Sequence, residues 1–209
     1  TLQNLKYYSR NEALLEELDE KYPADKGVFH YMQKSAGFPW YRNEKASYYP
    51  FGDYGYPIML EELRKAERFI FIEYFIIEEG RMWNGILEIL EEKARQGVDV
   101  RVLYDDLGSF FTLSGKYARE LEGKGIKCIP FNRINPILNI IINHRDHRKI
   151  MVIDGRIGYT GGVNIADEYI NEVVKFGHWK DVGLRLEGEG VRELTKLFLL
   201  DYGLNVRKE

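Results

Sequence analysis

Apolar side chains recur along the chain in blocks that switch between helical and strand spacing. Leu14, Leu18 and Tyr22 repeat every four residues, which predicts a short amphipathic helix over about 10–22. From Tyr31 to Pro57 the sequence is rich in Tyr, Pro and Gly, a composition typical of turns and short strands. We expect this lead-in to pack on the unit that follows it.

After residue 56, a helix followed by a strand is predicted three times. Gly97 and Gly125 supply the left-handed residues that end two of the helices, and Pro57 is assigned to the first turn of another. The predicted helices cover about 57–66, 82–96 and 116–124, and the strands cover about 68–77, 98–104 and 126–131. This alternation predicts an α/β fold: a mixed, mainly parallel β-sheet flanked by helices on both faces.

The passage after Phe131 breaks this alternation. It joins an apolar run and a basic cluster to two β-rich runs around the turn Asp154-Gly155, and then a Gly-Gly-x-Asn turn leads into a predicted helix. A strand and an amphipathic helix follow, at about 180–187 and 191–202. No linker interrupts the pattern, which predicts a single domain.

Composition narrows the class of protein. A chain of 209 residues that is 44% hydrophobic can bury a core without disulfides, and the single cysteine, Cys128, excludes a disulfide scaffold. A net charge of −3 argues against nucleic-acid binding by bulk electrostatics, so none is expected. The longest uncharged apolar runs, about ten residues, are half of the ~20 that a membrane-spanning helix needs.

The chain opens Thr1-Leu2-Gln3, without an initiator Met or a recognisable targeting segment. We therefore expect a soluble piece of a longer protein. We also expect residues 1–47 to form the lead-in and residues 48–209 the main domain.

His147 and Lys149 are the strongest candidates for chemistry. On a strand they project from the same face, because side chains alternate with a period of two. A neutral imidazole is a competent nucleophile near neutral pH, and an adjacent lysine attracts a phosphate and neutralises its charge as a bond breaks. The pair predicts phosphoryl chemistry.

Further residues are expected to complete a phosphate site. Gly161 and Gly162 would let backbone approach a phosphate closely, and Asn164, with Asp167 three residues later, is typical of a helix N-cap. Asp181 is a candidate to orient the imidazole, on a predicted strand face that it shares with Trp179.

Two acidic residues have open interpretations. Asp154 is the other candidate to orient His147, but its odd separation of seven residues places it on the opposite strand face, which favours a role in fixing the turn. Glu73 interrupts an apolar strand, so its carboxylate needs a partner, either a structural cation or Lys149 in the pocket. The pair Asp105-Asp106 follows a strand and fits either a ligand site or an ordinary turn.

The spacing His147-x-Lys149-x4-Asp154-x6-Gly161-Gly162-x-Asn164 resembles the HxKxxxxD signature of the phospholipase D superfamily. Within it, the chain is most similar to the N-terminal phospholipase D domain of bacterial cardiolipin synthases over roughly 48–203. The resemblance implies that His147, Lys149 and Asp154 form the catalytic set and that no metal or other cofactor takes part. It also implies that His147 attacks phosphatidylglycerol to form a covalent phosphohistidine. A second phosphatidylglycerol then yields cardiolipin and glycerol.

The family carries two such motifs and this chain holds one. The resemblance therefore implies a partner, either a second phospholipase D domain of the same protein or a second copy of the chain, and an intact protein at the bacterial cell membrane. A homodimeric phosphodiesterase or nuclease of the same superfamily and a non-catalytic phospholipid-binding half are the alternatives. Either histidine of the two motifs could be the nucleophile, the other serving as general acid.

Two neighbouring features bear on a membrane surface. The apolar run Ile134 to Ile142 could rest on a bilayer or be buried under neighbouring structure. Arg145, Arg148 and Lys149 form a dense basic patch that could meet anionic lipid headgroups or serve one scissile phosphate. The same basic residues argue against a metal ion held by His144 and His147.

Overall fold

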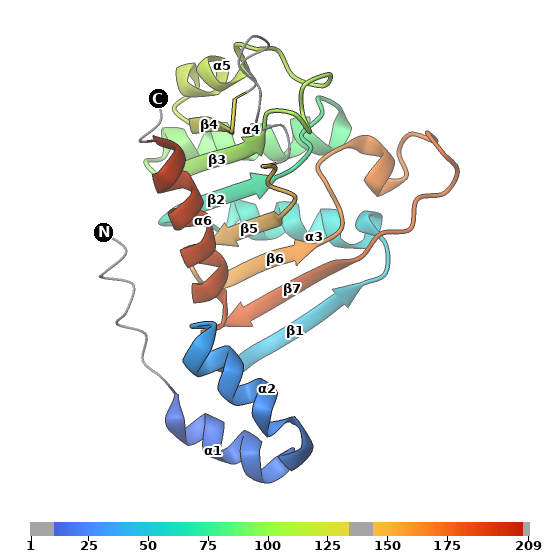
Figure 1. Cartoon of the computed structure of the whole chain (residues 1–209). Coiled ribbons are helices and arrows are strands. Elements are labelled where there is room, and N and C mark those ends of the chain that lie inside the picture. The colour runs from blue at the N-terminus through green and yellow to red at the C-terminus, as the bar shows by residue number, and fades with distance from the viewer. Residues whose placement is uncertain (1–10, 134–143, 207–209) are drawn as a thin grey trace.

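A seven-stranded sheet forms the centre of the molecule, with helices on both of its faces (Figure 1). The computed structural model describes residues 11–133 and 144–206. The strands are β1 (Asn43–Tyr49), β2 (Phe69–Tyr74), β3 (Asp99–Asp105), β4 (Lys127–Phe131), β5 (Lys149–Ile153), β6 (Ile157–Gly161) and β7 (Gly183–Gly188). The α-helices are α1 (Glu12–Lys21), α2 (Lys26–His30), α3 (Gly52–Arg64), α4 (Arg81–Arg95), α5 (Tyr117–Gly123) and α6 (Val191–Val206).

The α/β class and the mixed sheet are confirmed, but parallel pairing is limited to β2, β3 and β4. The strand order is β1-β7-β6-β5-β2-β3-β4, and four of its six pairings are antiparallel. The sheet is therefore not mainly parallel. The helix-strand alternation that produces parallel neighbours ends at β4, and β5 and β6 are joined by the tight turn at Asp154-Gly155, which makes them antiparallel.

Two apolar clusters hold the helices on the sheet. The larger lies under α3, α4 and α5 and includes Trp83, Val102 and Met151. The smaller joins the opposite face to α6, where Phe71 stacks on Phe198 with ring centroids 4.7 Å apart. Alternate residues of each central strand thus enter different clusters, as a sheet covered on both faces requires.

Several boundaries differ from the sequence prediction. Helix α3 begins at Gly52, so Pro57 lies inside it and not in its first turn. The turn at Asn164 leads to a four-residue 3₁₀ helix, Asp167–Ile170, and Asn164 does not cap it. Asp167 instead accepts hydrogen bonds from the backbone N–H groups of Arg81 and Met82, at the start of α4. The prediction of Asn164 as a helix N-cap is therefore wrong, and the residue that accepts from the N–H groups at a helix start is Asp167.

The lead-in supplies an edge strand as well as helices. Helices α1 and α2 lie beyond the β1 end of the sheet in Figure 1. Strand β1 pairs with β7 along its length, and the predicted boundary between lead-in and main domain, after residue 47, falls inside this strand. The Tyr41 hydroxyl donates to Glu193 of α6 at 2.8 Å.

One edge of the sheet collects the strand ends that matter for function. Since β5 and β7 run opposite to β2, β3 and β6, the carboxyl ends of the latter three lie beside the amino ends of β5 and β7. We call this the site edge. In the part of the chain that the structure describes, no helix combines the length and the apolar character needed to cross a membrane.

Candidate active site

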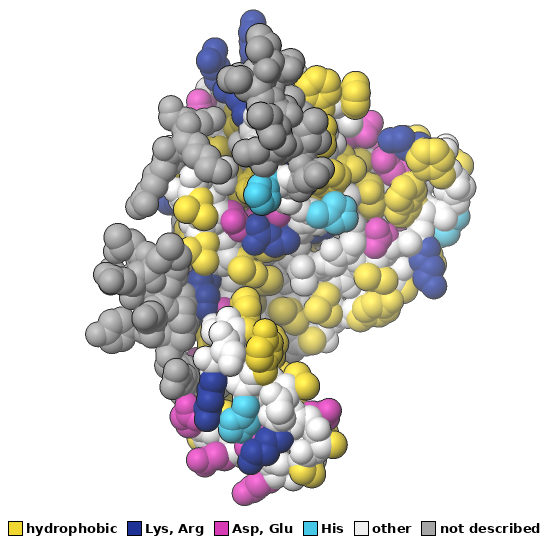
Figure 2. Space-filling model, in the orientation of Figure 1, with side chains coloured by type: hydrophobic (Ala, Val, Ile, Leu, Met, Phe, Trp, Pro, Cys, Tyr) yellow, Lys and Arg dark blue, Asp and Glu magenta, His cyan; other side chains and the backbone are white. Residues whose placement is uncertain are grey.

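His147 and Lys149 lie at the site edge, where Lys149 is the first residue of β5 and His147 precedes it by two residues. The exposed imidazole of His147 lies against the Phe75 ring, with centroids 4.8 Å apart, and Lys149 Nζ lies 5.4 Å from the same ring. Phe75 directly follows β2, so two neighbouring strands bring the three side chains together. Figure 2 shows histidine, basic and acidic side chains gathered in the middle of this face.

Lys149 is a buried cation. Its residue is 4% exposed, and its Nζ donates to the His147 carbonyl at 2.7 Å. Burial lowers the pKa of Lys149, and the charges of Asp146 and Asp181 oppose that shift. A partly desolvated ammonium attracts an anion more strongly than one in bulk water, because the effective dielectric constant is lower.

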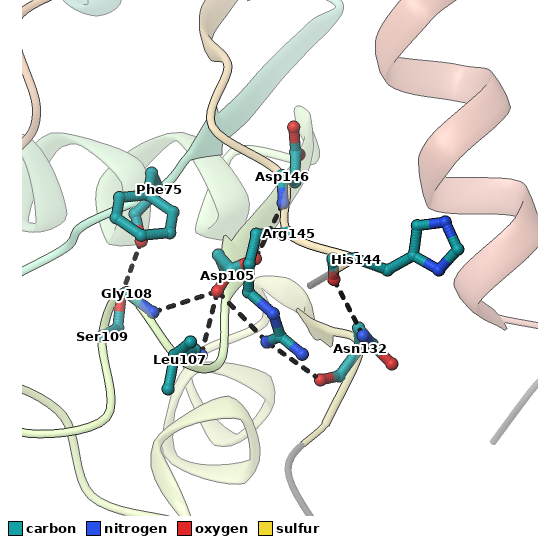
Figure 3. Close-up of polar contacts among 9 residues, drawn as sticks. All are labelled: Phe75, Asp105, Leu107, Gly108, Ser109, Asn132, His144, Arg145 and Asp146. Carbon is teal, nitrogen blue, oxygen red and sulfur yellow. Dashed lines mark hydrogen bonds and ion pairs between the residues drawn. The ribbon is translucent and has the colours of Figure 1, made fainter. Parts of the chain in front are cut away.

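Asp105 anchors the segment that leads to His147 (Figure 3). Its buried carboxylate accepts from the backbone N–H groups of Leu107, Gly108 and Asp146, at 2.9, 3.0 and 2.8 Å. It also pairs with Arg145 Nη1 at 3.4 Å. The end of β3 therefore fixes the backbone immediately before the candidate nucleophile.

Asn164 performs a similar function on the other side. It is buried, its Oδ1 accepts from the Ile76 N–H at 3.2 Å and its Nδ2 donates to the Tyr169 hydroxyl at 2.8 Å. Its neighbour Ile165 exchanges backbone hydrogen bonds with Ile76 and Glu78. The amide thus binds protein groups and holds the segment that follows Phe75 in place.

The two glycines, Gly161 and Gly162, make room for neighbouring protein groups. Gly161 has a φ of +144°, and a Cβ there would collide with the Val182 carbonyl. A Cβ on Gly162 would collide with the Asp181 carboxylate. The glycines therefore allow Asp181 to lie against the Gly162 backbone, on the side from which its charge acts on Lys149.

Trp179 and Asp181 precede β7 and do not share a strand face, because the strand begins at Gly183. Asn171 holds this segment instead: its side chain donates to the Trp179 carbonyl at 3.1 Å and accepts from the Trp179 N–H at 2.7 Å. The Trp179 ring also contacts Tyr169, with centroids 4.9 Å apart.

The partner of Glu73 is the cation Arg148 and not Lys149. It lies opposite Ile150 in the sheet, whereas Lys149 lies opposite Tyr74, so Glu73 and Lys149 point to different faces. Glu73 is fully buried on the α6 face, with its Oε1 3.1 Å from Arg148 Nε. Arg148 also pairs with Asp146, at 2.9 Å, and with Asp201 of α6.

The Arg148 guanidinium thus faces three carboxyl groups, and a proton on Glu73 reduces the excess of negative charge. Burial, and then the adjacent Asp146, raise the pKa of Glu73 to about 9 from an ordinary value of 4.5, while Arg148 opposes the shift. Folded protein therefore holds a proton on Glu73 across neutral pH.

The raised pKa predicts a pH dependence of stability. Between about pH 4.5 and 9 the folded protein binds a proton at Glu73 that the unfolded chain releases, so the contribution of Glu73 to stability falls as pH rises through this window. Glu73→Gln mimics the protonated form. We expect its free energy of unfolding to exceed that of the parent by a margin that grows from pH 5 to pH 9 in urea titrations. A margin that shrinks with pH would contradict the assignment.

The structure does not bring Asp154 to His147. Asp154 directly follows β5 at the edge opposite the site edge, with a φ of +54°. Its carboxylate accepts from the backbone N–H groups of Glu67, Arg68 and Phe69, at 2.9, 2.8 and 2.9 Å. This geometry matches the turn-fixing interpretation and ties the β5–β6 turn to the start of β2.

We expect Asp154→Ala to lower the free energy of unfolding by about 2 kcal/mol, because three N–H donors lose their acceptor. Asp154→Asn should lose less, since asparagine keeps one carbonyl oxygen and tolerates a positive φ. Both can be measured by urea unfolding, with turnover normalised to the folded fraction. Normal stability combined with lost turnover would instead support a catalytic Asp154.

Sequence reasoning missed Asp146 and Phe75 and left Asp105 undecided. An acidic residue within the basic run Arg145 to Lys149 was an available signal for Asp146, and nothing in the pattern distinguished Phe75 from its apolar neighbours. The apolar run Ile134 to Ile142 lies outside the described residues. Within the described residues, no group of three or more His, Cys, Asp or Glu side chains is arranged to hold a metal ion.

Comparison with known proteins places these residues in a family. Residues 59–174 match the family model described as "Cardiolipin synthase, PLD-like domain". A Streptococcus mutans protein described as uncharacterized is 47% identical over 193 residues, which cover 92% of this chain and 42% of that protein. A cardiolipin synthase of Geobacillus kaustophilus is 45% identical over 152 residues, which cover 72% of this chain and 30% of the synthase.

The chain therefore spans less than half the length of either relative. A solved structure of a phospholipase D family member, Nuc from Salmonella typhimurium, superposes with a TM-score of 0.54 at 15% identity. That match covers 76% of this chain and 93% of the solved chain, and it supports the fold.

Proposed function

This chain belongs to the cardiolipin synthase family defined by the PLD-like domain, and from that premise we propose that it supplies one half of a phosphatidyltransferase active site. The observation that carries the proposal is that an exposed imidazole, His147, and a buried ammonium, Lys149, both lie against the Phe75 ring at one sheet edge. Phosphatidylglycerol is the proposed substrate, and cardiolipin and glycerol are the products.

The proposed first step forms a covalent intermediate. A ring nitrogen of His147 attacks the phosphorus of phosphatidylglycerol, the bond to the glycerol headgroup breaks, and the departing oxygen takes a proton from a general acid. Lys149 neutralises charge on the non-bridging oxygens. In the second step the headgroup hydroxyl of another phosphatidylglycerol attacks the phosphohistidine, gives its proton to the same acid-base group and frees His147.

The general acid is proposed to come from a second His-x-Lys motif, in another domain or another copy of the chain. Asp105 and Asn164 act as positioning residues in this scheme: they bind backbone and side-chain groups beside His147 and Phe75, and neither contacts the imidazole through a hydrogen bond among the described residues. Preorganised geometry of this kind contributes to catalysis by holding reacting groups in place.

The test uses the full-length protein and phosphatidylglycerol labelled separately in an acyl chain and in the headgroup glycerol. Thin-layer chromatography should show cardiolipin and free glycerol in equal amounts. Phosphatidic acid in place of cardiolipin would indicate a phosphodiesterase. Lipid binding without any product would favour the non-catalytic alternative, and degradation of plasmid DNA would favour the nuclease.

A further inference from the structure

Two loops at the site edge carry large apolar side chains that are mostly exposed to solvent. Phe111 is 94% exposed, Phe176 is 81% exposed and Val174 is 79% exposed. Phe111 belongs to the loop after β3, and the other two belong to the loop before β7. Single exposed apolar residues are common on protein surfaces, whereas several at one end of a molecule indicate an interaction surface.

The two loops lie on opposite sides of the candidate nucleophile. In the sheet order β7-β6-β5-β2-β3, one loop leaves the end of β3 and the other enters β7, with β5 and His147 between them. In Figure 1 the loop between β6 and β7 projects far from the sheet, and Figure 2 shows hydrophobic side chains near its tip. Any partner that covered both tips would also cover the site.

The bases of both loops are tied to the core, so the tips are held outward. Thr112 Oγ1 donates to the Ile77 carbonyl at 2.6 Å, immediately after Phe111. Asn171 and Trp179 exchange two hydrogen bonds across the base of the second loop. Exposure of the rings is therefore a property of anchored loops and not of free chain ends.

The charge around the tips suits an anionic surface. The exposed lysines Lys116 and Lys180 lie on the same two loops, and a third exposed lysine, Lys175, pairs with Glu168 at 3.0 Å. The exposed acidic residue of the second loop, Glu172, is paired with Arg81 of α4 at 2.6 Å. Apolar tips flanked by lysines are the composition of segments that enter the boundary between lipid headgroups and acyl chains.

We propose that Phe111, Val174 and Phe176 enter the surface of an anionic bilayer, so that the site edge faces the membrane and His147 meets the headgroup phosphate of a lipid that stays in the bilayer. This proposal rests on the proposed function, because a lipid substrate is the reason to choose a bilayer over a protein as the occupant. Two separate projections on either side of a polar site also fit a flat partner.

The test places an environment-sensitive fluorophore at each tip of the full-length protein. Phe111→Cys and Phe176→Cys are labelled with a nitrobenzoxadiazole dye, and unsubstituted protein provides the background because Cys128 is buried. Val28→Cys is the matched control, since Val28 is 59% exposed but lies on α2, beyond the β1 end of the sheet and away from both loops. Each protein is mixed with vesicles of phosphatidylglycerol and phosphatidylcholine that contain lipids spin-labelled in the acyl chain.

Spin-labelled lipid should quench the dye at positions 111 and 176 at least twofold more than the dye at position 28, and omission of phosphatidylglycerol should weaken the effect. Equal quenching at all three positions overturns the proposal. A dye that is blue-shifted without lipid and is not quenched shows that protein covers the tips, which also overturns it. Cardiolipin formation by unlabelled protein, assayed in detergent micelles, tests the function separately: product without quenching rejects only the membrane-facing loops, and quenching without product rejects only the transfer reaction.

Discussion

An alanine in place of His147 is expected to abolish phosphatidyl transfer, with a loss on the order of 10⁴-fold or more, as removal of a covalent nucleophile does in other enzymes. The imidazole is exposed beside Phe75 and Lys149, and no other described histidine shares that position. If His147 is the general acid instead, its loss should spare transfer from substrates with a leaving group that needs no proton. Rates with such an activated phosphodiester therefore distinguish the two roles.

His144→Ala is the matched control for this experiment. His144 lies three residues earlier and its side chain is exposed. Its backbone carbonyl accepts a hydrogen bond from the Asn132 side chain at 2.8 Å, and the substitution retains that carbonyl. Figure 3 shows its ring directed away from Asp105. Transfer close to the parental rate is expected for His144→Ala. Equal losses in both variants would point to damage of the segment and not to loss of the nucleophile.

Arg148→Met should produce the largest loss of stability, about 2–4 kcal/mol, because it leaves the carboxylates of Asp146 and Asp201 without their cation and the protonated carboxyl of Glu73 without its partner. Partial exposure of Arg148 keeps the expected value below the upper end for a fully buried pair. Glu73, Asp146 and Asp201 come from β2, from the segment before β5 and from α6, so the guanidinium joins three parts of the fold. Urea unfolding at neutral pH measures the effect.

Arg156→Met is the comparison for Arg148→Met, since Arg156 pairs with Glu187 at 3.2 Å on the surface and should contribute at most about 1 kcal/mol. Addition of Asp201→Asn to Arg148→Met should restore part of the lost stability by removing one repelling charge. A loss for Arg148→Met no greater than that for Arg156→Met would show that the cluster is held together by packing alone.

The pattern of apolar residues predicted the helix-strand units and the segment that carries the chemistry because these depend on local spacing. It did not predict that β1 pairs with β7 or that most of the sheet is antiparallel, since pairing between residues far apart in sequence leaves no local trace. Glu73 shows the difference between what local spacing predicts and what strand pairing decides. Its position in an apolar strand predicted a buried carboxylate with a partner, but only the register of β2 against β5 decides between Arg148 and Lys149.

The two acidic residues that follow strands show the same division. Asp105 is the last residue of β3 and Asp154 directly follows β5. Both accept several backbone N–H groups, yet one lies at the site edge and the other at the opposite edge. Both residues are aspartates at the carboxyl end of a strand, so the sequence alone does not distinguish them, and the direction of each strand in the sheet does. Because β3 is parallel and β5 antiparallel to β2, the residues at the carboxyl ends of β3 and β5 lie at opposite edges of the sheet.

The placement of Asp154 gives a physical meaning to the four residues that separate it from Lys149. Those residues, Ile150 to Ile153, are the whole crossing of the sheet by β5, with the buried ammonium at one end and the turn anchor at the other. The spacing between Lys149 and Asp154 in the motif therefore equals the length of strand that crosses the sheet. One inserted residue would turn either the lysine or the aspartate to the wrong face, so the interval between them tolerates changes of residue type but not of length.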